Sequence, residues 1–167
     1  FTTAGGVAAN RVARWDGTAW SAIGSGMNAS VSALVVLPNG DLVAGGQFTT
    51  AGGVTANRIA IWNGNSWSAI GSGFSIGTVL SLAYNGALYA GKTYSPYLSS
   101  WTGGTWQALS VGGSFDQWES VDALAVLPNG SVVVGGGFER VGASVPNTRY
   151  IAVWGGNTWS ALGLGMN

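Results

Sequence analysis

Residues 48–73 read FTTAGGVTANRIAIWNGNSWSAIGSG, and residues 1–26 of the same chain read FTTAGGVAANRVARWDGTAWSAIGSG. The two stretches are near-copies that lie 47 positions apart, and weaker copies bring the total to about three and a half. Self-similarity at such a period is typical of stacked repeats, in which one unit cannot bury its apolar face alone. The repetition therefore says much more about architecture than about activity.

The first half of each repeat predicts a β-hairpin. Residues 31–37 are short, apolar and rich in β-branched side chains, and residues 41–46 form a second strand-like run. Asn39 and Gly40 lie between them. An Asn-Gly pair between two such runs is a strong hairpin signal, because both central residues of the turn need a positive φ.

The second half of the repeat predicts another hairpin. Residues 58–62 and 66–70 flank Asn63 and Gly64. The strand at 31–37 does not alternate polar and apolar residues, so we expect both of its faces to be covered. A four-stranded sheet that is buried on both faces and repeated around an axis describes a propeller blade. The predicted fold class is all-β, a β-propeller built from four-stranded blades.

Eight of the nine tryptophans recur in the second hairpin at a fixed spacing. With a two-residue turn at Asn63-Gly64, Trp62 faces Asn65, and Trp67 becomes its diagonal neighbour on the same face. Burying one indole hides roughly 150–250 Å², a gross stabilisation of ~4–6 kcal/mol as an upper bound. We therefore expect these indoles to pack between neighbouring blades rather than to contact a ligand. The pairs are Trp15/Trp20, Trp62/Trp67, Trp101/Trp106 and Trp154/Trp159.

The repeats divide the chain into unequal parts. Residues 1–30 supply the second hairpin of an incomplete blade, 31–73 a blade, 74–112 a divergent blade, and 113–167 an insertion loop plus a blade. Closed propellers have roughly four to eight blades, so about three and a half should not close a ring. The leftover hairpin exposes a strand edge that invites pairing. We favour a fragment of a larger propeller, with ring closure by oligomerisation and an extended fibre as the alternatives.

Composition argues against several classes of function. Six basic and six acidic residues offer no clustered basic face for nucleic acid. The absence of Cys and His removes thiol chemistry, the usual zinc and copper ligands and the commonest general base. Uninterrupted apolar runs such as 33–37 are too short for a helix that crosses a bilayer. We expect no catalytic residue, no metal, no cofactor, no nucleic-acid partner and no membrane insertion.

The motifs resemble the kelch-type β-propeller repeat, and residues 48–60 are similar to bacterial delta-60-type repeats and fungal cortical polarity-marker proteins. The resemblance implies a propeller that serves as a surface or binding module. Galactose oxidase shares the kelch architecture but needs His and Cys, which this chain lacks. The motif reads Asn39-Gly40, Gly45-Gly46, Trp62, Trp67 and again Asn129-Gly130, Gly135-Gly136, Trp154, Trp159.

The third unit departs most from the pattern and is the best place to look for a ligand. Its middle loop is shortened, and the segment after it is lengthened and contains the one unpaired tryptophan. Aromatic faces and carboxylates suit a carbohydrate, whereas the structural alternative is a packed loop or an interface. A Ca²⁺ site or a glycosidase carboxylate pair is a weaker interpretation. The candidate ligand-binding residues are Tyr94, Tyr97, Asp116, Trp118 and Glu119.

Asn10-Arg11 recurs as Asn57-Arg58. Because this pair recurs in each repeat, we expect its side chains to hydrogen-bond to the loop backbone or to neighbouring carbonyl groups rather than to contact a partner.

The sequence thus predicts a non-enzymatic, secreted or cell-surface repeat protein that acts as a scaffold or protein-binding module. The alternatives are a lectin-like carbohydrate-binding module and a structural protomer of a surface filament or sheath. The expected partners are other copies of the chain or flanking repeats of a longer chain, and protein or glycan ligands.

Overall fold

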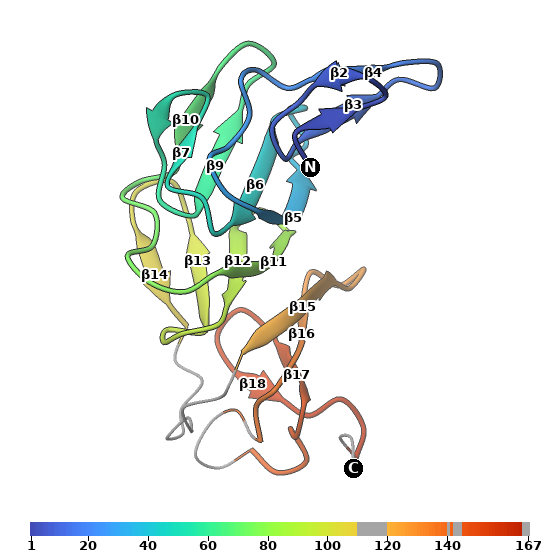
Figure 1. Cartoon of the computed structure of the whole chain (residues 1–167). Coiled ribbons are helices and arrows are strands. Elements are labelled where there is room, and N and C mark those ends of the chain that lie inside the picture. Colours follow the sequence, from blue (N-terminus) through green and yellow to red (C-terminus); the bar gives the residue numbers. More distant parts are fainter. Residues whose placement is uncertain (110–119, 140, 142–144, 165–167) are drawn as a thin grey trace. The chain divides into compact units, whose positions relative to one another are not determined.

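The structure is a computed structural model that describes residues 1–109, 120–139, 141 and 145–164 (Figure 1). All regular elements in these residues are β-strands, which confirms the all-β prediction. No described residue belongs to a helix long and apolar enough to cross a membrane. The chain forms two compact units, Phe1–Ile76 and Gly77–Asn167, which are described separately.

The first unit contains a four-stranded antiparallel sheet whose strands follow one another in sequence order (Figure 1). A two-stranded hairpin precedes this sheet, and two short hairpins lie in the Gly-rich loops. The sheet is β5 (Val31–Val36), β6 (Leu42–Gly46), β9 (Ile59–Trp62) and β10 (Trp67–Ala69); the hairpins are β3 (Ala13–Trp15) with β4 (Trp20–Ala22), β1 (Thr3–Ala4) with β2 (Val7–Ala8), and β7 (Thr50–Ala51) with β8 (Val54–Thr55).

The second unit contains two four-stranded antiparallel sheets of the same order, and they pack on each other. The Ser81 hydroxyl of the first sheet donates a hydrogen bond to the Val121 carbonyl of the second, at 3.2 Å. A Cβ on Gly91 would collide with Val121, so only glycine permits this approach. The sheets are β11 (Val79–Tyr84), β12 (Leu88–Lys92), β13 (Leu98–Trp101) and β14 (Trp106–Ala108), and β15 (Val121–Val126), β16 (Val132–Gly136), β17 (Ile151–Trp154) and β18 (Trp159–Ser160).

The turn of the second hairpin lies one residue later than predicted. The Asn63 N–H donates to the Ser66 carbonyl at 3.3 Å, which makes Gly64 and Asn65 the central residues. The Asn63 side chain causes this shift, since its Oδ1 accepts hydrogen bonds from the backbone N–H groups of Asn65 and Ser66. The two tryptophans that flank the turn are therefore directly opposite each other, not diagonal.

Asp16 caps the equivalent turn of the first hairpin. Hydrogen bonds from the backbone N–H groups of Ala19 and Thr18, then from the Thr18 hydroxyl, lower the pKa of Asp16 to about 2. A carboxylate that accepts several hydrogen bonds stays ionised, because each bond favours the charged form.

The other hairpin turn also differs from the prediction. The Leu37 N–H donates to the Asp41 carbonyl at 2.8 Å, so Pro38, Asn39 and Gly40 form a three-residue loop. Within this loop only Gly40 has a positive φ, of 89°. A three-residue loop needs one left-handed residue at its end, and glycine adopts that conformation without strain.

Strand β5 is not covered on both faces, contrary to the prediction from its apolar sequence. Burial alternates along it, and the side chains of Leu34 and Val36 are exposed. Successive side chains of a strand point to opposite faces of the sheet, so one face of β5 is open.

Each unit has its own apolar core, and each core includes an indole pair. In the first unit, Phe48 and Ile23 pack in one cluster with Trp62 and Trp67. In the second unit, the cluster holds Leu109 together with Trp154 and Trp159.

Candidate functional site

The indole pair of the first unit's sheet is covered by the segment that leaves the preceding hairpin. Trp62 and Trp67 lie with ring centroids 5.5 Å apart and planes tilted by 50°. The Trp67 Nε1–H donates to the Ile23 carbonyl at 2.9 Å, and Trp67 is only 4% exposed. A buried indole needs such an acceptor for its N–H.

Gly24 makes this close approach possible. A Cβ at this position would lie 2.9 Å from Cζ3 of Trp62 and 3.1 Å from Cδ1 of Trp67. Gly24 also has a φ of 58°, which other residues adopt only with strain. We call residues 23–26, and the equivalent residues of other hairpins, the exit segment. The exit segment of one hairpin thus covers the indole pair of the next, so this pair packs against a neighbouring repeat; packing between propeller blades stays a prediction.

The first indole pair has the same internal geometry but no such cover. Trp15 and Trp20 have centroids 5.4 Å apart and a tilt of 49°. Gly5 lies against Trp20, as Gly52 lies against Trp67. Trp15 is nevertheless 50% exposed and Trp20 42% exposed. The other six paired indoles are buried or half-buried.

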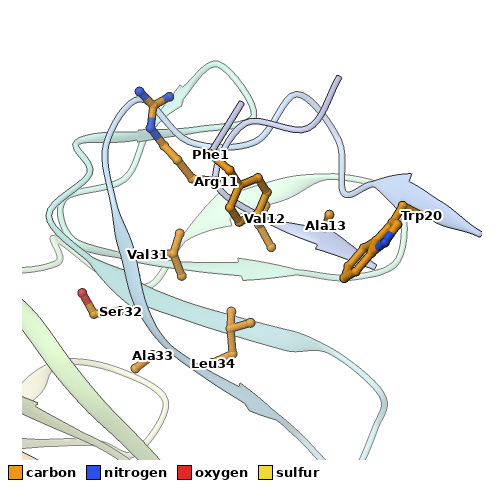
Figure 2. Close-up of a pocket in the computed structure, with 9 residues that line it drawn as sticks. All are labelled: Phe1, Arg11, Val12, Ala13, Trp20, Val31, Ser32, Ala33 and Leu34. Carbon is orange, nitrogen blue, oxygen red and sulfur yellow. The ribbon is translucent and has the colours of Figure 1, made fainter. Parts of the chain in front are cut away.

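An open pocket of about 430 Å³ adjoins the uncovered pair (Figure 2). Figure 2 shows residues near the start of the chain on one side of the pocket and strand β5 on the other. Its lining is apolar except for one serine and one arginine. The lining residues are Phe1, Arg11, Val12, Ala13, Trp20, Val31, Ser32, Ala33 and Leu34.

The pocket borders a free strand edge. In the sheet of the first unit, β9 pairs with β6 on one side and β10 on the other. Within residues 1–76, all of which the structure describes, its counterpart β3 pairs only with β4. The hydrogen bond from the Asp16 N–H to the Ala19 carbonyl identifies which residues of β3 direct their backbone N–H and C=O groups toward β4. Because hydrogen-bonding residues alternate along a strand, the backbone groups of Ala13 and Trp15 point to the free edge.

The repeated Asn-Arg pair holds the exit segment in place. Asn10 Nδ2 donates to the Ser25 carbonyl at 3.0 Å, and Arg11 Nη1 donates to the Met27 carbonyl at 2.8 Å. In the next repeat, Asn57 donates to Ser72 at 3.2 Å and Arg58 to Phe74 at 2.6 Å. These bonds confirm the expectation that the pair satisfies neighbouring carbonyls. Arg11 and Arg58 both have a φ of 66°, in the left-handed region.

The two described residues of the predicted carbohydrate site differ in exposure. Tyr94 is 56% exposed, whereas Tyr97 is 7% exposed and packs in the core with Val132 and Phe138. Asp116, Trp118 and Glu119 lie outside the described residues. Carbohydrate binding there stays a prediction, and a glycan array with Trp118→Ala as control tests it.

Lys92 is a buried cation at the position that Gly46 occupies in the preceding repeat. Burial lowers the pKa of Lys92 from 10.5 to about 8, because desolvation penalises the ammonium form. Its backbone N–H donates to the Tyr97 carbonyl at 2.7 Å, which closes the shortened loop of the divergent repeat, residues 74–112.

Sequence reasoning missed the pocket and the uncovered pair, because the repeats make every indole pair look alike. Comparison with protein-family models, with curated proteins and with solved structures gives no match.

Proposed function

We propose that the chain is a non-enzymatic β-propeller repeat protein, secreted or displayed on a cell surface, that acts as a scaffold and binds proteins. It binds an extended segment of its partner along the free edge of β3. The observation that carries this proposal is that edge, bordered by the apolar pocket. The resemblance of the sequence to kelch-type and delta-60-type repeats supports the propeller and the surface location.

Strand addition suits this edge for a geometric reason. A partner strand gains main-chain hydrogen bonds from the free edge, and pockets beside the edge select its side chains. The unpaired backbone groups of Ala13 and Trp15 supply the first requirement, and the pocket supplies the second. The pairing of β6 with β9, from Leu42 opposite Trp62 to Gly45 opposite Ile59, gives the register that we expect for a partner strand on β3, the counterpart of β9.

The pocket also indicates the chemistry of the partner. Its lining is apolar, and the one charged side chain, Arg11, already donates to the Met27 carbonyl. An extended segment with small and aliphatic side chains therefore fits better than a strongly charged one. Strand β6, which reads LVAGG, is the example of such a segment that the chain itself contains.

A synthetic peptide with the sequence of residues 41–47, DLVAGGQ, is the probe. Isothermal titration calorimetry should show saturable binding, and the amides of Ala13 and Trp15 should exchange more slowly in its presence. A scrambled peptide of the same composition should not bind. Absence of saturable binding by the DLVAGGQ peptide contradicts the proposal.

A matched pair of variants locates the interaction. Ala13→Pro removes one N–H from the free edge and leaves the β3–β4 ladder intact, because that N–H points away from β4. Ala13→Ser keeps the N–H. Binding should fall at least about tenfold in Ala13→Pro and stay near the original value in Ala13→Ser. Equal binding by the two variants places the peptide elsewhere.

A further inference from the structure

The chain contains four Asn-Gly pairs, and each lies in a loop between two paired strands. An asparagine side chain can cyclise onto the backbone nitrogen of the next residue, and glycine hinders this attack least because it has no Cβ. By sequence alone the four pairs are equal candidates for such a modification, so their loops must decide which one reacts. The pairs, in which all four asparagines are exposed, are Asn39-Gly40, Asn63-Gly64, Asn85-Gly86 and Asn129-Gly130.

The attacking group is the backbone nitrogen of the glycine, and in two of the pairs this group is engaged. Its N–H donates a hydrogen bond of 2.9 Å to the carbonyl three residues earlier, from Gly40 to Leu37 and from Gly130 to Leu127. A nitrogen held in this way must break its hydrogen bond before it can attack a carbonyl carbon. Within the described hairpin loops, the N–H groups of Gly64 and Gly86 make no such bond.

The Asn63 side chain is activated by its own turn. Its Oδ1 accepts hydrogen bonds from the backbone N–H groups of Asn65 at 3.0 Å and Ser66 at 2.9 Å. Negative charge develops on this oxygen when a nucleophile adds to Cγ, so the two N–H groups act as an oxyanion hole. A Cβ on Gly64 would meet no heavy atom within 4 Å, so the turn is open to water.

Asn85 is less well arranged for the same reaction. Among the described residues, its Oδ1 accepts one hydrogen bond, from the Ala87 N–H at 3.3 Å. Its Nδ2, the atom that must leave as ammonia, donates to the Gly130 carbonyl at 2.5 Å, which holds the side-chain amide in place. Asn63 is therefore the pair in which an unengaged nucleophile meets a doubly hydrogen-bonded carbonyl.

We propose that Asn63 is a site of spontaneous covalent modification, which converts it to aspartate and isoaspartate through a succinimide. The Gly64 nitrogen bonds to Cγ of Asn63, the Cγ–Nδ2 bond breaks, and the proton of the Gly64 nitrogen leaves with Nδ2 as ammonia. Water then opens the ring at Cγ to give aspartate, or at the main-chain carbonyl to give isoaspartate. The reaction consumes water, releases ammonia and needs no oxidant or reductant. It is independent of strand addition at β3.

The first hairpin shows that the aspartate product fits this turn. Asp16 stands at the position of Asn63, and its Oδ1 accepts the same two backbone hydrogen bonds, from the residues two and three positions later. Isoaspartate instead adds a methylene group to the main chain between Trp62 and Trp67, whose ring centroids lie 5.5 Å apart. Isoaspartate should therefore loosen this indole pair, whereas aspartate should preserve it.

Peptide mapping by mass spectrometry tests the proposal on the folded 167-residue chain during storage in a mildly alkaline buffer. Asn63 should convert at least about tenfold faster than Asn39 and Asn129. In guanidinium chloride the three sites should react at similar rates, because each is then an Asn-Gly pair without its folded loop. Three results overturn the proposal: an unmodified Asn63, a folded-state rate no higher than those of Asn39 and Asn129, or the same preference for Asn63 in the unfolded chain.

Asp16→Asn is the matched variant, because it places an Asn-Gly pair in the equivalent turn. Position 16 should then convert at a rate close to that of Asn63 in the same molecule, and a position 16 that stays unmodified while Asn63 converts contradicts the role of the turn.

Asn63→Asp is the control for the consequence of the reaction. This variant should unfold at the denaturant concentration of the original chain, whereas stored protein enriched in isoaspartate should unfold at a lower one. Equal unfolding of the two contradicts the loosening of the indole pair.

Discussion

The Trp67 indole donates its N–H to the carbonyl oxygen of Ile23, 44 residues earlier in the chain, at 2.9 Å. This bond joins the indole pair of one repeat to the exit segment of the previous one. One repeat of this kind is not stable alone, because the preceding repeat supplies a hydrogen-bond acceptor for its indole N–H and apolar contacts for its indole rings. Trp67, which makes this bond, is 4% exposed, whereas Trp20 is 42% exposed.

Gly24→Ala should lower the free energy of unfolding of the first unit by about 1–2 kcal/mol more than Gly6→Ala. Both glycines have a positive φ, so the backbone strain is similar. Only at Gly24 does the new methyl group meet an indole pair. Urea denaturation followed by circular dichroism measures the difference. Equal losses in the two variants would show that the exit segment is not packed on the indoles.

Trp67→Phe should cost about 1–3 kcal/mol more in unfolding free energy than Trp20→Phe. The first change removes a buried ring and leaves the Ile23 carbonyl without its indole donor. The second change acts on a half-exposed indole. Thermal and urea denaturation of both variants provide the comparison, and a larger loss for Trp20→Phe contradicts the assignment of these environments.

Arg58→Ala should destabilise the first unit by about 1 kcal/mol more than Arg58→Gly. Both variants lose the hydrogen bond from the guanidinium to the Phe74 carbonyl. They differ in backbone strain, because alanine at a φ of 66° is unfavourable and glycine is not. If the two variants are equally stable, the left-handed conformation of Arg58 is not what the protein adopts in solution.

Lys92 should make stability rise with pH in alkaline solution. Its pKa is about 8 in the folded chain and 10.5 in the reference state, so the unfolded chain binds more protons between these values. The free energy of unfolding therefore increases as pH rises from about 8 to 10.5, by no more than about 3 kcal/mol. Lys92→Met should be more stable than the original chain at pH 7 and lack this increment. Parallel pH profiles for the two proteins would contradict the lowered pKa.

The repeat period and the alternation of turns and strands were enough to predict the four-stranded sheets. The turn register was not predictable from the Asn-Gly dipeptide, because the Asn63 side chain caps the turn and moves its centre by one residue. The burial of Tyr97 could not be predicted either, because the sequence of a short loop between two strands does not show which side chain points into the core.

The candidate site was the least predictable part. The sequence directed attention to the divergent repeat at residues 74–112 and the insertion after it, while the structure shows an open pocket and an exposed indole pair near the start of the chain. Trp15 and Trp62 occupy equivalent positions in near-identical hairpins, so sequence similarity cannot tell them apart. Their exposure depends on a contact made by a segment elsewhere in the chain, which only three-dimensional packing reveals.

Hydrogen exchange of the indole N–H protons is the most direct measurement of the stacking that underlies this account. Trp→Phe changes assign the two signals. The Trp67 proton, bonded to the Ile23 carbonyl, should exchange at least about a hundredfold more slowly than the Trp20 proton. Equally fast exchange of both protons would contradict the claim that one repeat covers the indoles of the next.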